Sequence, residues 1–236
     1  MLEFLKNKKI LVVVAHPDDE ILGLGGTMNM LISEYNAKVK VVILGEGITS
    51  RSDVRNNSFW EKELKEHKKN IKDAQKKIGY HQVKCYDFPD NRFDTVPLLD
   101  IIKVIETEKE SFNPDVIFTH HSSDLNIDHK ITFQSTFTSA RPMNSENVKL
   151  FITFETSSGT EWMPSSEPDI FKPNLFITLK KENIDSKISA MECYEFEKRK
   201  WPHPRSPEAL KVLSKYRGYC NGVDYAEAFR IIRFLN

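Results

Sequence analysis

Cysteine is scarce in this sequence, neither charge is in excess, and no apolar run is long. The three cysteines, Cys85, Cys193 and Cys220, are far apart and lack the paired spacing of a zinc ribbon or a redox motif. We therefore expect buried, reduced thiols. Lysine plus arginine equals aspartate plus glutamate at 34 each, which gives no basic excess for nucleic acid or an anionic membrane. The expected partner is a small molecule.

The apolar runs are too short for targeting or anchoring segments. The first run, residues 10–15, is shorter than the core of a signal peptide, and no small-residue cleavage site follows it. No other stretch approaches the ~18 apolar residues of a membrane span. We therefore expect a cytoplasmic protein. The 236 residues contain no internal repeat or linker, so we expect one domain over 1–236, while the oligomeric state is not readable from the sequence.

Apolar stretches of strand length alternate with patterns of helical spacing along the chain. The expected strands are 10–15, 38–44, 82–86, 115–120, 148–154 and 175–179, and the expected helices are 21–35, 57–78, 98–110, 128–140, 185–198 and 207–221. This alternation predicts an α/β, Rossmann-like fold, with a mostly parallel sheet and helices on both faces. Ligands of such sheets bind beyond the carboxyl ends of the strands, so we expect the functional site there.

Two of these strands run directly into polar clusters. The first ends in the sequence His-Pro-Asp-Asp-Glu at 16–20, and the strand at 115–120 is followed by a cluster that extends to His129. Crowded carboxylates raise one another's pKa, and a bound cation is the usual relief. Imidazole and carboxylate ligands suit zinc or a similar divalent ion. Since both clusters lie at carboxyl ends of strands, they can converge on one metal site.

We choose His16, Asp19 and His129 as the metal ligands, because three protein ligands plus water is the usual catalytic zinc arrangement. Two residues three apart in a tight turn can face the same point, which leaves Asp18 beside the ion but free of it. The alternative is a surface turn with a helix N-cap aspartate and an acidic first turn. Spacing alone leaves both interpretations open.

The motif Ala-His-Pro-Asp-Asp-Glu at 15–20, followed by Asp-Leu-Asn-Ile-Asp-His at 124–129, resembles the LmbE-like, PIG-L-type family of zinc-dependent sugar de-N-acetylases. The resemblance implies that His16, Asp19 and His129 are the metal triad and that Asp18 is the catalytic carboxylate. It implies hydrolysis of the amide of an N-acetylated sugar or sugar conjugate. In that reaction zinc-bound water attacks the amide, and Asp18 acts as general base and then as acid. Another divalent metal such as Fe²⁺ would also suit the ligands.

The sequence departs from part of this family at the expected oxyanion partner. Some members carry a histidine three positions before the last metal ligand, whereas this chain has Asn126. An asparagine amide can donate a hydrogen bond to the oxyanion but cannot carry the proton. We therefore keep Asn126 as a catalytic candidate, with His120 or His121 as a substitute. Asp128 is expected to orient a neighbouring imidazole.

Four further residues are candidates for binding the substrate. Arg51 could hold a hydroxyl or a phosphate, and Asp124 would suit sugar hydroxyls. His203 and Arg205 lie on a proline-stiffened loop that could line the pocket. Their alternatives are a solvent-facing loop arginine at 51 and packing of the 202–206 loop against the C-terminal helices.

Two other functions remain open at this point. A metal- or carbohydrate-binding protein without turnover could retain the same ligands, although a pure binding site has no need of a spare carboxylate such as Asp18. A non-haem iron oxygenase also uses two histidines and one carboxylate. A dinucleotide site at Gly23, Gly25 and Gly26 is not expected, since Met28 occupies the position of a required glycine. Close helix packing explains these glycines better.

Overall fold

The computed structural model describes residues 1–143 and 146–235, and it contains one seven-stranded sheet in the order β3-β2-β1-β4-β5-β7-β6. The strands are β1 (Lys9–Val14), β2 (Lys38–Gly45), β3 (Gln82–Phe88), β4 (Val116–His120), β5 (Leu150–Phe154), β6 (Leu175–Thr178) and β7 (Ala226–Phe234). Strands β3, β2, β1, β4 and β5 pair in parallel, whereas β7 is antiparallel to both of its neighbours. The prediction of a mostly parallel sheet is confirmed.

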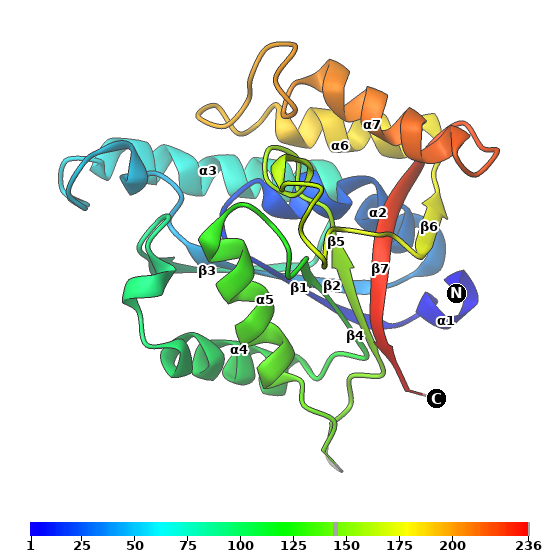
Figure 1. Cartoon of the computed structure of the whole chain (residues 1–236), viewed down its shortest axis with the longest axis horizontal. Coiled ribbons are helices and arrows are strands. Elements are labelled where there is room, and N and C mark those ends of the chain that lie inside the picture. Colours follow the sequence, from blue (N-terminus) through cyan, green and yellow to red (C-terminus); the bar gives the residue numbers. More distant parts are fainter. Residues whose placement is uncertain (144–145, 236) are drawn as a thin grey trace.

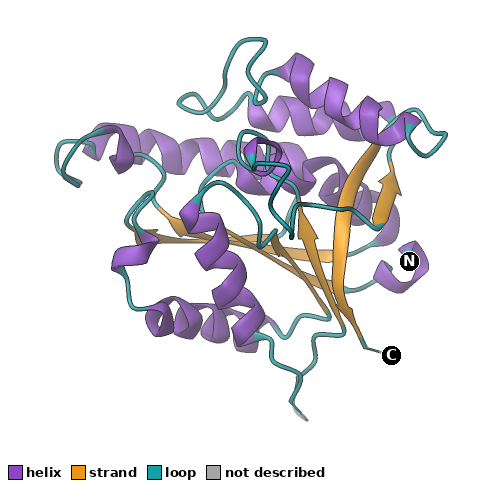
Figure 2. Ribbon diagram, in the orientation of Figure 1, coloured by secondary structure: helices purple, strands orange, loops and turns teal. Residues whose placement is uncertain are grey.

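Helices cover both faces of this sheet, as predicted (Figure 1, Figure 2). The helices are α1 (Leu2–Leu5), α2 (Asp19–Tyr35), α3 (Glu61–Ile78), α4 (Leu98–Phe112), α5 (Ile127–Ser139), α6 (Lys181–Met191) and α7 (Pro207–Tyr219). Helices α2, α3, α6 and α7 lie on one side of the sheet, and α4 and α5 lie on the other. Short 3₁₀ turns occur at η1 (Thr49–Arg51), η2 (Phe93–Thr95) and η3 (Thr160–Trp162).

Strand β1 shows why the first apolar run contains no polar residue. Ile10, Val12 and Val14 enter the core under α2, while Leu11 and Val13 enter the core under α4. Successive side chains of a strand point to opposite faces, so a strand covered on both faces must be apolar throughout. The chain passes from β1 outward to β3 and then returns to place β4 on the other side of β1. This reversal brings the two polar clusters together at the carboxyl ends of β1 and β4, the usual ligand position in such sheets.

The C-terminal part of the chain differs from the prediction. Strand β7 was not predicted; it exists because β5 and β6 both pair with it. Helix α6 ends at Met191 instead of continuing to residue 198. A tertiary contact explains this early end. Tyr194 is fully buried and donates a hydrogen bond to the buried Glu20, and the chain leaves the helical conformation to place it there. Helix α3 begins at Glu61, four residues later than predicted, after a turn in which Asn56 accepts a hydrogen bond from the Phe59 amide.

Helix α2 packs closely on the sheet and is broken near its middle. A Cβ atom on Gly23 would lie 2.3 Å from the Phe154 ring, so the expectation of close packing is confirmed. The break is at Leu24, which has φ −150° and ψ 23°. The carboxylate of Glu227 accepts the amide protons that follow the break, and the ammonium of Lys187 donates to the carbonyl that precedes it. These two side chains also pair with each other at 2.6 Å, and both are buried.

The cysteines are free, but the prediction that they are buried is wrong. Cys85 and Cys220 are exposed and Cys193 is half-buried. Cys85 lies on β3, which is an edge strand and therefore has one unpaired side.

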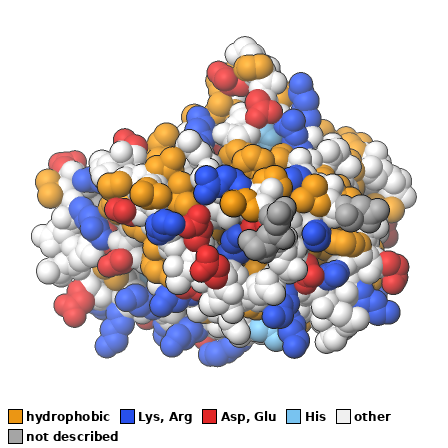
Figure 3. Space-filling model, turned by 90° about the horizontal axis from the view of Figure 1, so that it is seen from below, with side chains coloured by type: hydrophobic (Ala, Val, Ile, Leu, Met, Phe, Trp, Pro, Cys, Tyr) orange, Lys and Arg blue, Asp and Glu red, His pale blue; other side chains and the backbone are white. Residues whose placement is uncertain are grey.

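On the face formed by α4 and α5, acidic and basic side chains are interspersed (Figure 3). In residues 1–143 and 146–235, no helix combines the length and the apolar character needed to cross a bilayer.

Candidate active site

Three candidate ligands converge where β1 and β4 end. His16 follows β1, Asp19 begins α2 and His129 lies in the first turn of α5. One oxygen of Asp19, Oδ2, lies 3.3 Å from His129 Nε2 and 3.6 Å from His16 Nδ1. The three ligand atoms all lie within 4.8 Å of one another. The structure therefore brings together residues from opposite halves of the sequence, as expected from the two polar clusters at the carboxyl ends of strands.

The chemistry of this cluster fits a divalent metal ion. Asp19 Oδ1 and His129 Nε2 are buried, and neither has a hydrogen-bond partner among the residues that the structure describes. Buried polar atoms without partners are costly unless a ligand or an ion satisfies them. Two imidazole nitrogens and one carboxylate oxygen are a common donor set for zinc and for ferrous iron.

A second group of possible ligands, His16, Asp90 and Asp128, shares one imidazole with the first. His16 Nε2 hydrogen-bonds to Asp128 Oδ2 at 2.9 Å and lies 3.3 Å from Asp90 Oδ1. An imidazole nitrogen that donates its proton to a carboxylate has no lone pair for a metal. This hydrogen bond leaves His16 Nδ1 as the nitrogen that could bind a metal and gives Asp128 the geometry of a residue that fixes an imidazole ring.

Asp124 does not have the position that we expected for it. Its side chain is fully buried behind His129, with Oδ1 3.1 Å from His129 Nδ1, and Thr160 donates a hydrogen bond to Oδ2 at 2.8 Å. A carboxylate in this position cannot reach sugar hydroxyls in the cavity, so the expectation of substrate contact is corrected. Its contact with the far nitrogen of His129 is the arrangement that commonly orients a ligating imidazole.

Electrostatics keep Asp19 ionised in spite of its burial. Burial alone would raise the pKa of Asp19, but the adjacent His129 and His120 hold it well below its usual value. Burial opposes protonation of His129, yet Asp19 and Asp124 raise its pKa to about 9. In the metal-free protein, a proton on His129 therefore balances the buried carboxylates. A cation bound by the same residues would take over that balance.

His120 also differs from our expectation, because it does not reach the cavity. It is fully buried and stacks on His129 with ring centroids 3.9 Å apart. Its Nε2 accepts a hydrogen bond from the Ala15 amide at 3.0 Å, so the ring proton resides on Nδ1 and faces Thr156 Oγ1. Neither nitrogen is free to donate to an oxyanion. His121 is committed as well, since Nδ1 accepts from the Ser123 amide.

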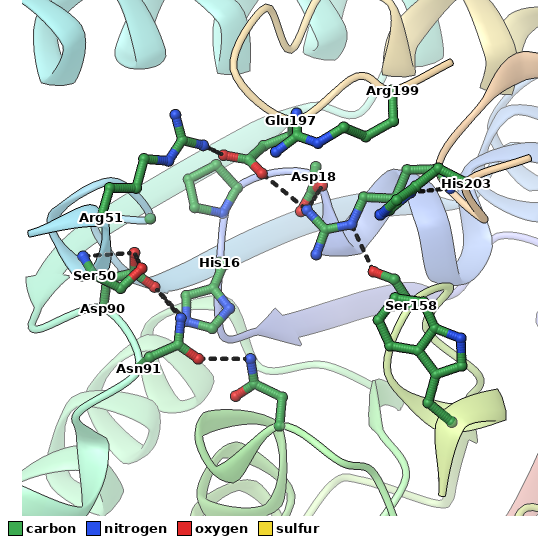
Figure 4. Close-up of a pocket in the computed structure, with 15 residues that line it drawn as sticks. His16, Asp18, Ser50, Arg51, Asp90, Asn91, Ser158, Glu197, Arg199 and His203 are labelled. Carbon is green, nitrogen blue, oxygen red and sulfur yellow. Dashed lines mark hydrogen bonds and ion pairs between the residues drawn. The ribbon is translucent and has the colours of Figure 1, made fainter. Parts of the chain in front are cut away.

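A cavity of about 300 Å³ opens beside the metal cluster (Figure 4). Of the residues chosen from the sequence, it is lined by His16, Asp18, Arg51, Asn126, His203 and Arg205. Trp162 lines it too and meets the His203 ring edge-on at 6.0 Å. Asn126 caps α5 by accepting a hydrogen bond from the Asp128 amide, and its own amide group donates to Asn91. The amide of Asn126 is therefore held at the cavity wall.

Two arginines and two carboxylates form a chain of charges across this cavity. Arg205 Nη1 donates to Asp18 Oδ2 at 3.0 Å and to Glu197 Oε2 at 2.9 Å. Arg51 pairs with the other oxygen of Glu197. Glu197 thus ties the loop after β2 to the loop after α6. Sequence reasoning missed Glu197 because it lies in the segment that we expected to be helical, and no local motif marks it.

Burial and a neighbouring arginine act in opposite directions on the pKa of Asp18. Burial raises its pKa well above the usual value, and the neighbouring Arg205 partly opposes this shift. Asp18 is 1% exposed and is not one of the three converging ligands. A buried carboxyl group with a raised pKa beside a cavity has the properties of a general base or acid.

Comparisons with known proteins match this chain to a family of deacetylases. The family model of PIG-L, the GlcNAc-PI de-N-acetylase, matches residues 11–140. The uncharacterized deacetylase YaiS of Escherichia coli K12 is 27% identical over 195 residues, which cover 80% of this chain and 92% of YaiS.

Solved structures with the same fold have different activities. The N,N'-diacetylchitobiose deacetylase of Pyrococcus horikoshii is 19% identical, with a TM-score of 0.72 over 98% of this chain and 86% of that one. GalB, the 4-carboxy-2-hydroxymuconate hydratase of Pseudomonas putida KT2440, is 18% identical, with a TM-score of 0.73 over 95% and 96%. At these identities the likeness shows the fold alone. The family match, however, spans more than half of the sequence, and the chain belongs to the PIG-L family of N-acetyl sugar deacetylases.

Proposed function

We propose that this protein is a zinc-dependent hydrolase that removes the N-acetyl group from an N-acetylated sugar or sugar conjugate. His16, Asp19 and His129 would hold the ion. The observation that carries the proposal is that Asp18, a buried carboxylate outside this ligand set, faces the cavity next to it. A site that only bound metal would need no such group.

The residues divide the chemistry between them. A divalent ion at this position lowers the pKa of water and polarises a carbonyl group. Asp18 accepts the proton of the attacking water and later gives it to the departing amine. Arg205 stabilises the ionised form of Asp18, while burial keeps the carboxyl basic enough to take the proton. Asn126 is our candidate for a hydrogen bond to the oxyanion of the tetrahedral intermediate.

His120 has a different role in this proposal from the one expected from the sequence. Since both of its nitrogens are committed, we assign it to supporting His129 by stacking rather than to contact with the substrate. Arg51, His203 and Trp162 are left to bind the sugar, because all three line the cavity. An aromatic face and polar hydrogen-bonding groups together suit a pyranose ring.

Other functions remain as competitors, each with its own signature. A binding protein without turnover would retain metal and sugar affinity without releasing acetate, and an iron oxygenase would require oxygen. Hydration is a further candidate, because the hydratase GalB has the same fold. None of these reactions releases acetate from an N-acetyl sugar.

The test is acetate release from a panel of N-acetyl sugars and sugar nucleotides by protein of defined metal content. We expect turnover by the wild type, and a loss of about 100-fold or more in Asp18→Asn with unchanged metal stoichiometry. Asp53→Asn, which alters an exposed carboxylate outside the cavity, is the matched control. No acetate from any compound would favour a binding protein, and an active Asp18→Asn variant would refute the assignment of the base.

A further inference from the structure

Asp18 has an unusual backbone conformation for the residue that caps a helix. It is the N-cap of α2, yet its φ is 101° and its ψ is −26°. An N-cap aspartate normally has an extended backbone, and its carboxylate accepts hydrogen bonds from the first amides of the helix. The Asp18 side chain makes no such bond and pairs instead with Arg205 at the cavity wall. Positive φ is unfavourable for a residue with a side chain and persists only where the surroundings enforce it.

Glu20 supplies a contact that can enforce this conformation. Its Oε2 accepts a hydrogen bond from the Asp18 amide at 3.1 Å. Its Oε1 accepts hydrogen bonds from the hydroxyls of Tyr194 at 2.5 Å and Tyr80 at 3.5 Å. Glu20 is fully buried, so these contacts leave its carboxylate little freedom to move.

We propose that Glu20 is a positioning residue, which holds the Asp18 backbone in its left-handed conformation and so directs the Asp18 carboxylate into the cavity. The inference rests on the proposed function, in which Asp18 is the base. Glu20 accepts the amide proton of the cap residue, and this leaves the Asp18 side chain free of the capping role. Without that acceptor, the Asp18 backbone would relax toward the usual cap, and the carboxylate would turn toward the amides of α2.

Two conservative variants separate the hydrogen-bond geometry from the charge of Glu20. In Glu20→Gln the side-chain oxygen can still accept the Asp18 amide proton, and the amide group can donate to Tyr194, whose hydroxyl also accepts hydrogen bonds. In Glu20→Asp the charge remains, but the carboxylate is one methylene further from Asp18. We expect Glu20→Gln to retain kcat within about threefold and Glu20→Asp to lose about 10- to 100-fold, since small misplacements of catalytic groups have effects of that size. KM and metal stoichiometry should stay unchanged in both.

A double-variant comparison tests whether Glu20 acts through Asp18. In the Asp18→Asn background, Glu20→Asp should reduce the residual kcat no further, because the group that it positions is already lost. If Glu20→Asp lowers kcat by the same factor in the Asp18→Asn background as in the wild type, the proposal is overturned. A larger loss of kcat in Glu20→Gln than in Glu20→Asp would also overturn it. Tyr194→Phe removes a donor to Oε1 and spares Oε2, so an equal loss of kcat there would show general disruption of the core instead.

A crystal structure of each single variant provides a readout that does not depend on activity. Asp18 should keep its positive φ in Glu20→Gln and lose it in Glu20→Asp. A positive φ in both variants would overturn the positioning role even if the protein is a deacetylase. Absence of acetate release by the wild type would instead refute the proposed function, while the backbone comparison would still stand.

Discussion

The buried pair of Lys187 and Glu227 gives the most specific prediction about stability. The side chains are only 3% and 5% exposed and pair at 2.6 Å. Replacing both members of a buried ion pair by apolar residues is often neutral or even stabilising, whereas removing one member costs about 3–5 kcal/mol. We predict that this pair departs from the usual pattern, because both side chains also hydrogen-bond to backbone groups on either side of the break in α2.

The expected magnitudes follow from the groups that each variant leaves without a partner. Lys187→Met leaves the Glu227 carboxylate buried without its cation, at a cost of about 3–5 kcal/mol. The double variant Lys187→Met/Glu227→Leu removes both charges, but it leaves the carbonyl of Leu22 and the amides of Gly26 and Thr27 without their side-chain partners. Each buried group without a partner costs about 1–3 kcal/mol, so the free energy of unfolding of the double variant should remain at least about 3 kcal/mol below that of the wild type.

The measurement is urea unfolding of the metal-free protein, followed by circular dichroism with a constant m value across the series. Lys181→Met is the matched control on the same helix, because its pair with Asp185 is exposed and should contribute less than about 1 kcal/mol. A double variant as stable as the wild type would contradict this prediction, since it would show that the break in α2 does not depend on these side chains.

Two further predictions concern individual histidines. His129→Ala should abolish stoichiometric binding of zinc, measured by metal analysis after dialysis, and retention of one zinc per chain would remove His129 from the ligand set. His67 is buried, and burial lowers its pKa from 6.5 to about 4. Because the unfolded chain then binds the proton more tightly, His67 should lower the free energy of unfolding by up to about 3 kcal/mol as the pH falls from 6.5 to 4. His67→Leu should show a smaller decrease over this range in urea titrations of the metal-free protein, and an identical decrease would contradict the assignment.

Local pattern was sufficient for most of the fold and for the convergence of the three candidate ligands. The uninterrupted apolar run of β1 predicts a strand covered on both faces, and the alternation with helices predicts a parallel sheet. Since the carboxyl ends of parallel strands share one edge of the sheet, the sequence alone predicts that His16, Asp19 and His129 lie close together. The motif also singled out Asp18 as a carboxylate outside the ligand set.

Other features depend on contacts between segments that are distant in the sequence. Strand β7 forms only because β5 and β6 offer it hydrogen-bond partners, so local alternation did not reveal it. The early end of α6 depends on the contact of Tyr194 with Glu20, 174 residues away. That ending is what allows Glu197 to reach the cavity and bridge Arg51 and Arg205.

The sequence alone predicts which groups the candidate site contains: two imidazoles, one carboxylate that could bind a metal and one further carboxylate, at the ends of two strands. Which side chains reach the cavity depends on the tertiary structure. His120 is the last residue of β4 and Asp124 follows that strand, yet both are buried against His129 and do not line the cavity. Sequence spacing predicts which strand end a residue is near, whereas its depth depends on the packing of other segments around it.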